Sequence, residues 1–230
     1  MKAVFLDFDG VISNSIEETY IVSLKAYYGF SVIKNEATIK ELFYKHRGLV
    51  GPPHNFCALH NVIEHVLDNQ IRTNNQSFEQ LFLQAMKTNQ KRKDQFESIF
   101  FAIRRQLQND RVFWLSLNPI TKYGESLTEK DSPNYYLITT KDLHAVEMLL
   151  SEYNIKFRKI FSKNDYEEFG SKGAIINDVM SSEPVYKTGV FVDDSTAHLD
   201  TVSNPSVKCY FADWGYGVNE DYEIYNQEIW

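Results

Sequence analysis

Two aspartates one residue apart, Asp7 and Asp9, follow a short apolar segment near the start of the sequence. The segment at residues 3–6 is continuously apolar, and Gly10 follows the second aspartate, as is typical of a buried strand that ends in a sharp turn. Carboxylates this close repel each other, and a bound cation relieves the repulsion. The ordinary alternative is a turn that uses Asp and Gly only for their backbone preferences. The spacing favours a cation-dependent site at the end of this strand.

Three later positions repeat the same arrangement of a polar group at the end of an apolar segment. Thr139 and the pair Asp193 and Asp194 each follow a short apolar run, and Lys172 starts a predicted helix. Each has an ordinary explanation, since Thr and Asp often cap helices and Lys is common on surfaces. Together they follow one rule, because the carboxyl ends of parallel strands meet at one edge of a sheet, where ligands bind. We therefore predict that these side chains share one site.

The second half of the chain is predicted to alternate strands with helices, a pattern typical of parallel βαβ units. Apolar, β-favouring segments predict strands at residues 135–138, 157–161, 190–192 and 207–211. Helices are predicted between them, including one over residues 171–179. With the first strand, these elements predict an α/β fold with a Rossmann-like parallel sheet.

The region between the first two strands is predicted to be all helical. Apolar residues recur at helical spacing in segments 15–28, 36–44, 57–67 and 78–107. Residues 111–133 show no clear periodicity. We therefore predict a core domain made of residues 1–13 and 111–230, and an inserted all-helical domain of residues 14–110.

Composition limits the classes of function. The chain has 230 residues, 43% of them hydrophobic, which is enough for a packed core. Its net charge is −7, so the basic face of a nucleic-acid-binding protein is not expected. No apolar run has the length of a membrane span and no signal peptide is predicted. Cys57 and Cys209 lie far apart with no metal-type spacing, which suits the cytoplasm.

The motifs resemble those of the haloacid dehalogenase-like hydrolases, in order and in spacing. The matching positions are residues 7–11, Thr139, Lys172 and the pair Asp193 and Asp194, each in its apolar context. The insertion stands where that family has its helical C1 cap. Residues 213–217 are also similar to the end of the phosphoglycolate-phosphatase-like members. The resemblance implies a phosphatase whose core carries the reaction and whose cap is the domain of residues 14–110.

The resemblance assigns a role in phosphate ester hydrolysis to each core residue. Asp7 is implied to be the nucleophile that forms an aspartyl-phosphate, which divides a difficult reaction into two steps. Asp9 is implied to protonate the leaving oxygen and then to activate water. Thr139, Thr140 and Lys172 are implied to bind the phosphoryl group and to neutralise its charge. Family members that displace halide lack the second aspartate, so Asp9 favours phosphoryl chemistry.

The resemblance also implies a Mg²⁺ ion, which prefers oxygen ligands. Asp7, the backbone carbonyl of Asp9, and Asp193 or Asp194 are implied to hold it, with Asp194 aligning best with the family ligand. The sequence departs from the family at His198, where the fourth motif often has a further acidic residue. The choice between the two later aspartates is left open by the sequence.

Substrate specificity is expected to come from the cap. The loop at residues 45–54 carries Arg47 and His54, which suit an anionic or hydroxylated ligand. A basic surface loop between two helices is the alternative. We expect a small phosphorylated metabolite as substrate and neither nucleic acid nor a membrane as partner, and we leave the oligomeric state open.

Three other functions compete with a phosphatase. A phosphomutase has the same core residues and differs in its cap. A phosphonate-cleaving enzyme needs a Schiff-base lysine from the cap, for which Lys45 is the candidate. A non-catalytic binding module on this fold needs none of the reactive residues, so the intact set argues against it.

Overall fold

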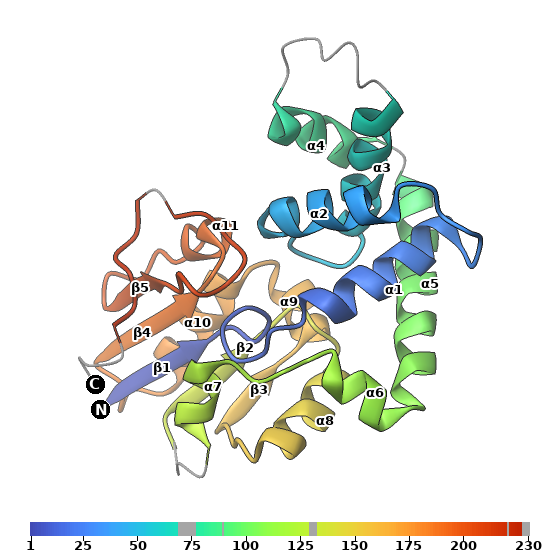
Figure 1. Cartoon of the computed structure of the whole chain (residues 1–230). Coiled ribbons are helices and arrows are strands. Elements are labelled where there is room, and N and C mark those ends of the chain that lie inside the picture. The colour runs from blue at the N-terminus through green and yellow to red at the C-terminus, as the bar shows by residue number, and fades with distance from the viewer. Residues whose placement is uncertain (69–76, 89, 129–132, 220, 227–230) are drawn as a thin grey trace. The chain divides into compact units, whose positions relative to one another are not determined.

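The computed structural model describes residues 1–68, 77–88, 90–128, 133–219 and 221–226 (Figure 1). The chain forms two compact units. The first, which we call the core unit, comprises Met1–Ser15 and Asn118–Trp230, and the second, the inserted unit, comprises Ile16–Leu117. The inserted unit therefore interrupts the core unit between its first and second strands.

The described residues of the core unit contain a five-stranded sheet in the order β3-β2-β1-β4-β5, with every neighbouring pair parallel. Its strands are β1 (Lys2–Leu6), β2 (Tyr135–Ile138), β3 (Lys159–Phe161), β4 (Thr188–Asp193) and β5 (Val207–Phe211). Strand β1 is central, since Val4 lies opposite Tyr135 on one side and Val190 on the other. Strands β1, β2 and β4 consist mostly of apolar, buried residues, as expected of a parallel sheet covered on both faces.

Helices connect the strands of the core unit. They are α7 (Lys122–Leu127), α8 (Leu143–Tyr153), α9 (Lys163–Phe169), α10 (Lys172–Ser182) and α11 (Thr196–Leu199). The first turns of α8 and α10 are capped, because Asp142 accepts a hydrogen bond from the Ala145 N–H and Ser171 accepts one from the Ala174 N–H. On one side of the sheet, Ile175 and Ile176 of α10 belong to the same buried apolar cluster as Phe5. The caps fix where α8 and α10 begin, and the cluster packs α10 against the sheet.

The regular elements among the described residues of the inserted unit are all helices. Its elements are α1 (Ile16–Tyr28), α2 (Glu36–His46), the 3₁₀ turn η1 (Arg47–Leu49), α3 (Asn55–Asp68), α4 (Phe78–Met86), α5 (Gln90–Gln108) and α6 (Arg111–Ser116). Its core includes stacked rings of Phe43, Phe56 and Phe100. A buried, two-pronged ion pair from Arg104 of α5 to Glu18 of α1 joins the first and fifth helices, at 2.8 and 3.1 Å. This unit has its own packed interior.

The predicted α/β class, with a parallel sheet and inserted helices, is confirmed. Differences occur in short elements. Helices α6 and α7 lie in the segment 111–133 for which no periodicity was found, and α9 was not predicted. Helix α6 packs against α5 and lies within the inserted unit, which therefore extends past residue 110. Residues 69–76, 89, 129–132, 220 and 227–230 of the predicted segments lie outside the described residues.

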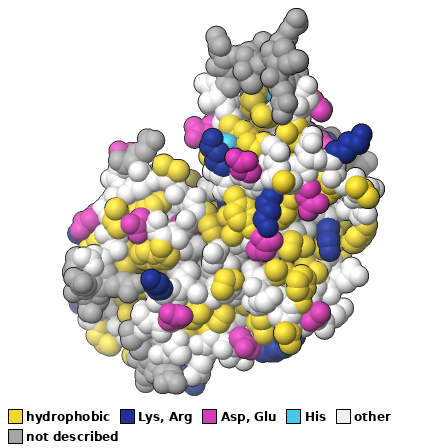
Figure 2. Space-filling view, in the orientation of Figure 1, with side chains coloured by type: hydrophobic (Ala, Val, Ile, Leu, Met, Phe, Trp, Pro, Cys, Tyr) yellow, Lys and Arg dark blue, Asp and Glu magenta, His cyan; other side chains and the backbone are white. Residues whose placement is uncertain are grey.

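The described helices include none with the length and apolar character needed to cross a bilayer. On the face drawn in Figure 2, Lys and Arg side chains are scattered among Asp and Glu side chains. The net charge of −7 is therefore not accompanied by a single basic patch on the described residues of that face.

Candidate active site

The carboxyl ends of β1 and β4 bring two of the predicted aspartates together. Leu6 lies opposite Val192, and the Asp7 N–H donates to the Val192 carbonyl at 3.0 Å. Asp7 therefore stands beside Asp193, the last residue of β4. The chain continues from β1 to β2 on one side of the sheet, whereas β4 and β5 lie on the other side. Such a reversal of strand order opens a crevice in which open α/β sheets bind ligands.

Lys172 lies between these two carboxylates. Its Nζ is 2.6 Å from Asp7 Oδ1 and 2.8 Å from Asp193 Oδ2, and its side chain is 1% exposed. Burial disfavours the ammonium, but the charges of Asp193 and Asp7 outweigh burial and raise the pKa of Lys172. Because Lys172 is the first residue of α10, the cap at Ser171 that fixes this helix also fixes the base of the lysine side chain. A permanent positive charge thus lies against Asp7.

The two aspartates differ in their environment. Burial, and then the charge of Asp193, raises the pKa of Asp7 to about 6. Burial also acts to raise the pKa of Asp193, but the charges of Lys172 and His198 outweigh it and lower that pKa to about 2. Asp193 also accepts a hydrogen bond from the Ser195 N–H at 2.9 Å, and His198 Nδ1 lies 3.3 Å from its Oδ2. Asp193 is therefore a fixed anion that holds Lys172 in place.

Asp194 is enclosed by backbone. Its Oδ2 accepts a hydrogen bond from the Tyr216 N–H at 2.6 Å. A Cβ on Gly10 would lie 2.2 Å from Asp194 Oδ2, and a Cβ on Gly215 would lie 2.2 Å from Asp194 Cβ. Gly10 also has φ +87°, a conformation that other residues rarely adopt. The two glycines allow the loop after β1 and the loop at 213–217 to approach this carboxylate closely.

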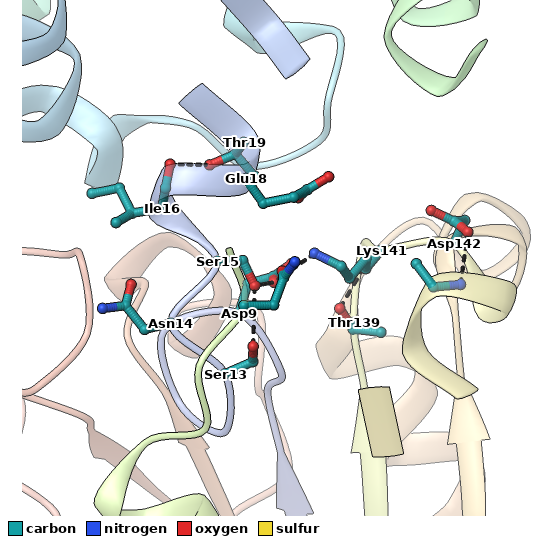
Figure 3. A network of polar contacts seen from close by, with 12 residues as sticks. Asp9, Ser13, Asn14, Ser15, Ile16, Glu18, Thr19, Thr139, Lys141 and Asp142 are labelled. Carbon is teal, nitrogen blue, oxygen red and sulfur yellow. Dashed lines mark hydrogen bonds and ion pairs between the residues drawn. The ribbon is translucent and has the colours of Figure 1, made fainter. Parts of the chain in front are cut away.

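Asp9 belongs to a second polar network, drawn in Figure 3. Its Oδ1 accepts hydrogen bonds from Ser15 Oγ at 2.5 Å and from Lys141 Nζ at 2.9 Å. Ser15 Oγ also lies 3.3 Å from Ser13 Oγ, which in turn lies 2.9 Å from the Tyr153 hydroxyl. Asp9 is thus paired with Lys141, whereas Asp7 is paired with Lys172.

Thr139 follows β2 at the same edge of the sheet. Its N–H donates to the Phe161 carbonyl at 2.9 Å, and its Oγ1 accepts from the Lys141 N–H at 3.1 Å. Leu137 pairs with Leu6, so Thr139 lies at the strand end next to the one that carries Asp7. Thr140 is partly exposed in the loop that follows. The structure therefore brings Asp7, Asp9, Thr139, Lys172, Asp193 and Asp194 to one edge of the core unit.

The donor set at this edge fits a divalent cation held by oxygen. Carboxylate oxygens of Asp7 and Asp194 and the Asp9 backbone carbonyl are the ligand types that Mg²⁺ prefers. Atoms of Asp7, Asp193 and His198 also lie within 4.8 Å of one another. That second group is a poorer candidate, because the Lys172 ammonium contacts two of its three members and would repel a cation. Of the two later aspartates, Asp194 is the better candidate ligand.

The two residues predicted to select the substrate belong to the inserted unit. Arg47, in η1, donates to the Val50 carbonyl at 2.8 Å and stacks over the Phe56 ring at 5.0 Å. His54 precedes α3 and lies 3.8 Å from Glu97. These contacts lie within the inserted unit, and substrate contact by either residue stays a prediction.

Sequence reasoning missed Lys141, Ser15 and the Tyr216 N–H. Lys141 had a usable signal, because it stands two residues after Thr139 at the same strand end. Ser15 had none, since a serine before a helix is an ordinary cap. Tyr216 acts through its backbone, which no residue type reveals.

No protein-family model matches the sequence, and a search of curated proteins finds no match. Solved structures do match. A haloacid dehalogenase-like family hydrolase from Streptococcus pneumoniae is 16% identical, with a TM-score of 0.52 covering 94% of this chain and 86% of that one. A predicted phosphoglycolate phosphatase from Haemophilus somnus is 12% identical, with a TM-score of 0.61 covering 96% and 88%. A predicted phosphatase from Clostridium acetobutylicum is 15% identical, with a TM-score of 0.54 covering 93% and 85%.

These matches extend over both units and are similar in length to this chain. Their identities are low, so the likeness is one of fold. The chain has the fold of the haloacid dehalogenase-like hydrolases.

Proposed function

We propose that this protein is a Mg²⁺-dependent phosphatase that hydrolyses a small phosphorylated metabolite through an aspartyl-phosphate on Asp7. One observation supports it most strongly. The Asp7 carboxylate lies at the end of β1, 2.6 Å from a buried lysine that a second, fixed carboxylate holds in place. This is an anionic nucleophile beside a permanent cation, which suits attack on a phosphoryl group whose oxygens need neutralising.

In the first step, an oxygen of Asp7 attacks phosphorus and the bond from phosphorus to the leaving oxygen breaks. Lys172 neutralises charge on the phosphoryl oxygens, and its ion pair with Asp193 keeps it positioned when Asp7 becomes esterified. Thr139 supplies a hydroxyl and a fixed backbone at the adjacent strand end. Preorganised charges of this kind are usually the largest contribution to catalysis.

Asp9 exchanges the proton that both steps require. It first protonates the leaving oxygen. It then takes a proton from the water that attacks phosphorus, while the bond between phosphorus and the Asp7 oxygen breaks and the Asp7 carboxylate is regenerated. Its own network with Ser15 and Lys141 suits a role different from that of Asp7.

Asp7, Asp194 and the Asp9 carbonyl would hold Mg²⁺, which when bound neutralises phosphoryl charge and lowers the pKa of Asp7. Burial and the charge of Asp193 raise the pKa of Asp7, so an added cation favours the ionised nucleophile. Asp194 is suited to this role because the hydrogen bond from the Tyr216 N–H to its Oδ2 fixes the orientation of the carboxylate.

The substrate is proposed to be a small metabolite acted on in the cytoplasm. Two of the matching structures are described as a phosphoglycolate phosphatase and a phosphatase, both predicted. The inserted unit is proposed to act as the cap, with Arg47 and His54 as its candidate substrate contacts.

Hydrolysis of an aryl phosphate, measured with Mg²⁺ and after chelation, tests the proposal. We expect metal-dependent release of inorganic phosphate that Asp7→Asn abolishes. Transfer of phosphate to a second sugar hydroxyl without release would instead identify a phosphomutase. Phosphate binding with no turnover of any phosphate ester would identify a binding module.

A further inference from the structure

Asp9 is held by two hydrogen-bond donors on one oxygen. Ser15 Oγ and Lys141 Nζ both contact Oδ1, at 2.5 and 2.9 Å (Figure 3). The Lys141 side chain is 0% exposed and the Asp9 side chain is 16% exposed. An ammonium buried to this degree is costly unless it is paired, so Lys141 is committed to this contact.

The backbone around Lys141 is fixed as well. Its N–H donates to Thr139 Oγ1 at 3.1 Å, and its carbonyl accepts from the Lys163 N–H at 3.0 Å. The next residue, Asp142, caps α8 through the Ala145 N–H at 3.0 Å. Lys141 is therefore built into the junction of β2 and α8, and its ammonium cannot move far from Asp9.

We propose that Lys141 is a positioning residue for Asp9, and that Ser15 shares this role. The proposal rests on the phosphatase function proposed above. The two donors fix the orientation of the Asp9 carboxyl group, which exchanges a proton with the leaving group. Lys141 thus acts on the reaction through Asp9 and makes no contact of its own with the phosphoryl group.

Lys141 assists the first step, in which the phosphoryl group is transferred to Asp7. An Asp7 oxygen forms a bond to phosphorus while the bond between phosphorus and the leaving oxygen breaks, and its electron pair stays on the leaving oxygen. That oxygen takes the proton from the Asp9 carboxyl group. Asp9 is left as a carboxylate whose new negative charge lies 2.9 Å from the Lys141 ammonium. The ammonium and the Ser15 hydroxyl stabilise this charge as it develops.

The contribution of Lys141 therefore depends on the leaving group. An alkoxide is strongly basic and needs the proton as it leaves, whereas a dinitrophenolate leaves without one. A residue that supports only the fold, or that binds the transferred phosphoryl group, affects both kinds of substrate equally. The dependence of kcat/KM on leaving-group basicity separates these roles.

The experiment compares wild type, Lys141→Met and a matched control, Lys156→Met, at an exposed lysine of the core unit. Each is assayed with Mg²⁺ on a series from 2,4-dinitrophenyl phosphate through phenyl phosphate to a simple alkyl phosphate. For Lys141→Met we expect kcat/KM to fall by about tenfold to a hundredfold on the alkyl phosphate, and by about threefold or less on the dinitrophenyl ester. Lys156→Met should match wild type throughout the series.

Two further measurements keep the test decisive. Ser15→Ala should show the same selective loss at smaller size, and it decides the matter if Lys141→Met does not fold. A beryllium fluoride adduct on Asp7, observed by ¹⁹F NMR, should form as readily in Lys141→Met as in wild type. Equal losses across the series, or a raised KM with unchanged kcat on the alkyl phosphate, would overturn the role of Lys141 while leaving the phosphatase intact. Absence of Asp7-dependent turnover in wild type would overturn both.

Discussion

Replacing Lys172 by methionine should destabilise the protein and stop turnover together. The substitution keeps a side chain of similar length but removes the ammonium that lies 2.6 Å from Asp7 and 2.8 Å from Asp193. Both carboxylates are buried, so each would remain as an uncompensated charge. Removing one partner of a buried ion pair costs about 3–5 kcal/mol in unfolding free energy. With an m-value of about 2 kcal/mol per molar urea, the midpoint should fall by about 1.5–2.5 M.

The loss of stability in Lys172→Met should depend on pH in a characteristic way. Without Lys172 the carboxylates have folded-state pKa values above their unfolded values, so the folded variant binds more protons and gains stability as the pH falls. In wild type, the lowered pKa of Asp193 has the opposite sign and withdraws stability in strong acid, as the pH falls toward about 2. The stability difference between the two proteins should therefore shrink as the pH is lowered from about 8 to about 5.

Urea unfolding followed by circular dichroism at several pH values measures this difference. Lys208→Met is the matched control, because Lys208 pairs with Glu223 at the same 2.8 Å, yet both side chains are more than half exposed. We expect little change for the control. A loss below about 1 kcal/mol for Lys172→Met, or a difference that does not vary with pH, would refute the buried ion-pair reasoning.

Four other predictions concern the site and the inserted unit. Asp7→Asn should fold normally and lose both turnover and the beryllium fluoride adduct, and normal turnover would exclude Asp7 as nucleophile. Chelation should stop activity without unfolding the protein, and Asp194→Ala should weaken Mg²⁺ binding measured by calorimetry; activity that survives exhaustive chelation would contradict the metal assignment. Arg47→Ala should raise KM for the natural substrate more than for an aryl phosphate, whereas equal losses would mean that its contacts with Val50 and Phe56 serve only the fold. Burial lowers the pKa of His60 to about 3, below the unfolded value, so its neutral form contributes stability above about pH 6.5 that is lost as the pH falls. His60→Gln should therefore reduce the slope of unfolding free energy against pH on the acid side by up to about 1.4 kcal/mol per pH unit. An unchanged slope would mean that other groups cause the loss of stability in acid.

Several strands could be predicted from the sequence because a short apolar run in each ends at a polar residue. That rule located β1, β2 and β4 and with them the positions of Asp7, Thr139 and Asp193. The short helices were missed for the opposite reason. Helix α6 has six residues, too few for a periodic pattern, and its start depends on the Asp110 cap.

The partners of the site residues could not be predicted in the same way. The place of Lys141 two residues after Thr139 indicates the strand end, but its pairing with Asp9 depends on the path of the loop after β2. Similarly, the position of α10 relative to β4 determines that Lys172 pairs with Asp193 and not with Asp194. The different roles of the two aspartates follow from that pairing. Pairings between distant residues are properties of the fold.

The central position of β1 has a consequence for the order of synthesis. Val4 lies opposite Tyr135 and Val190, so the first strand of the chain to be made has its neighbours among much later residues. At translation rates of about 5–20 residues per second, β1 waits about ten to forty seconds for β4. The inserted unit, by contrast, is a continuous segment, Ile16–Leu117, with its own packed interior.

We therefore expect the inserted unit to fold on the ribosome first, while the apolar β1 segment remains exposed beside it. An exposed apolar strand is what holdase chaperones bind, and the growing chain should depend on them during this interval. Because the loop at 213–217 encloses Asp194, the proposed catalytic edge is completed only after residue 217 has been made. A nascent chain therefore carries a folded insertion long before it carries a working site.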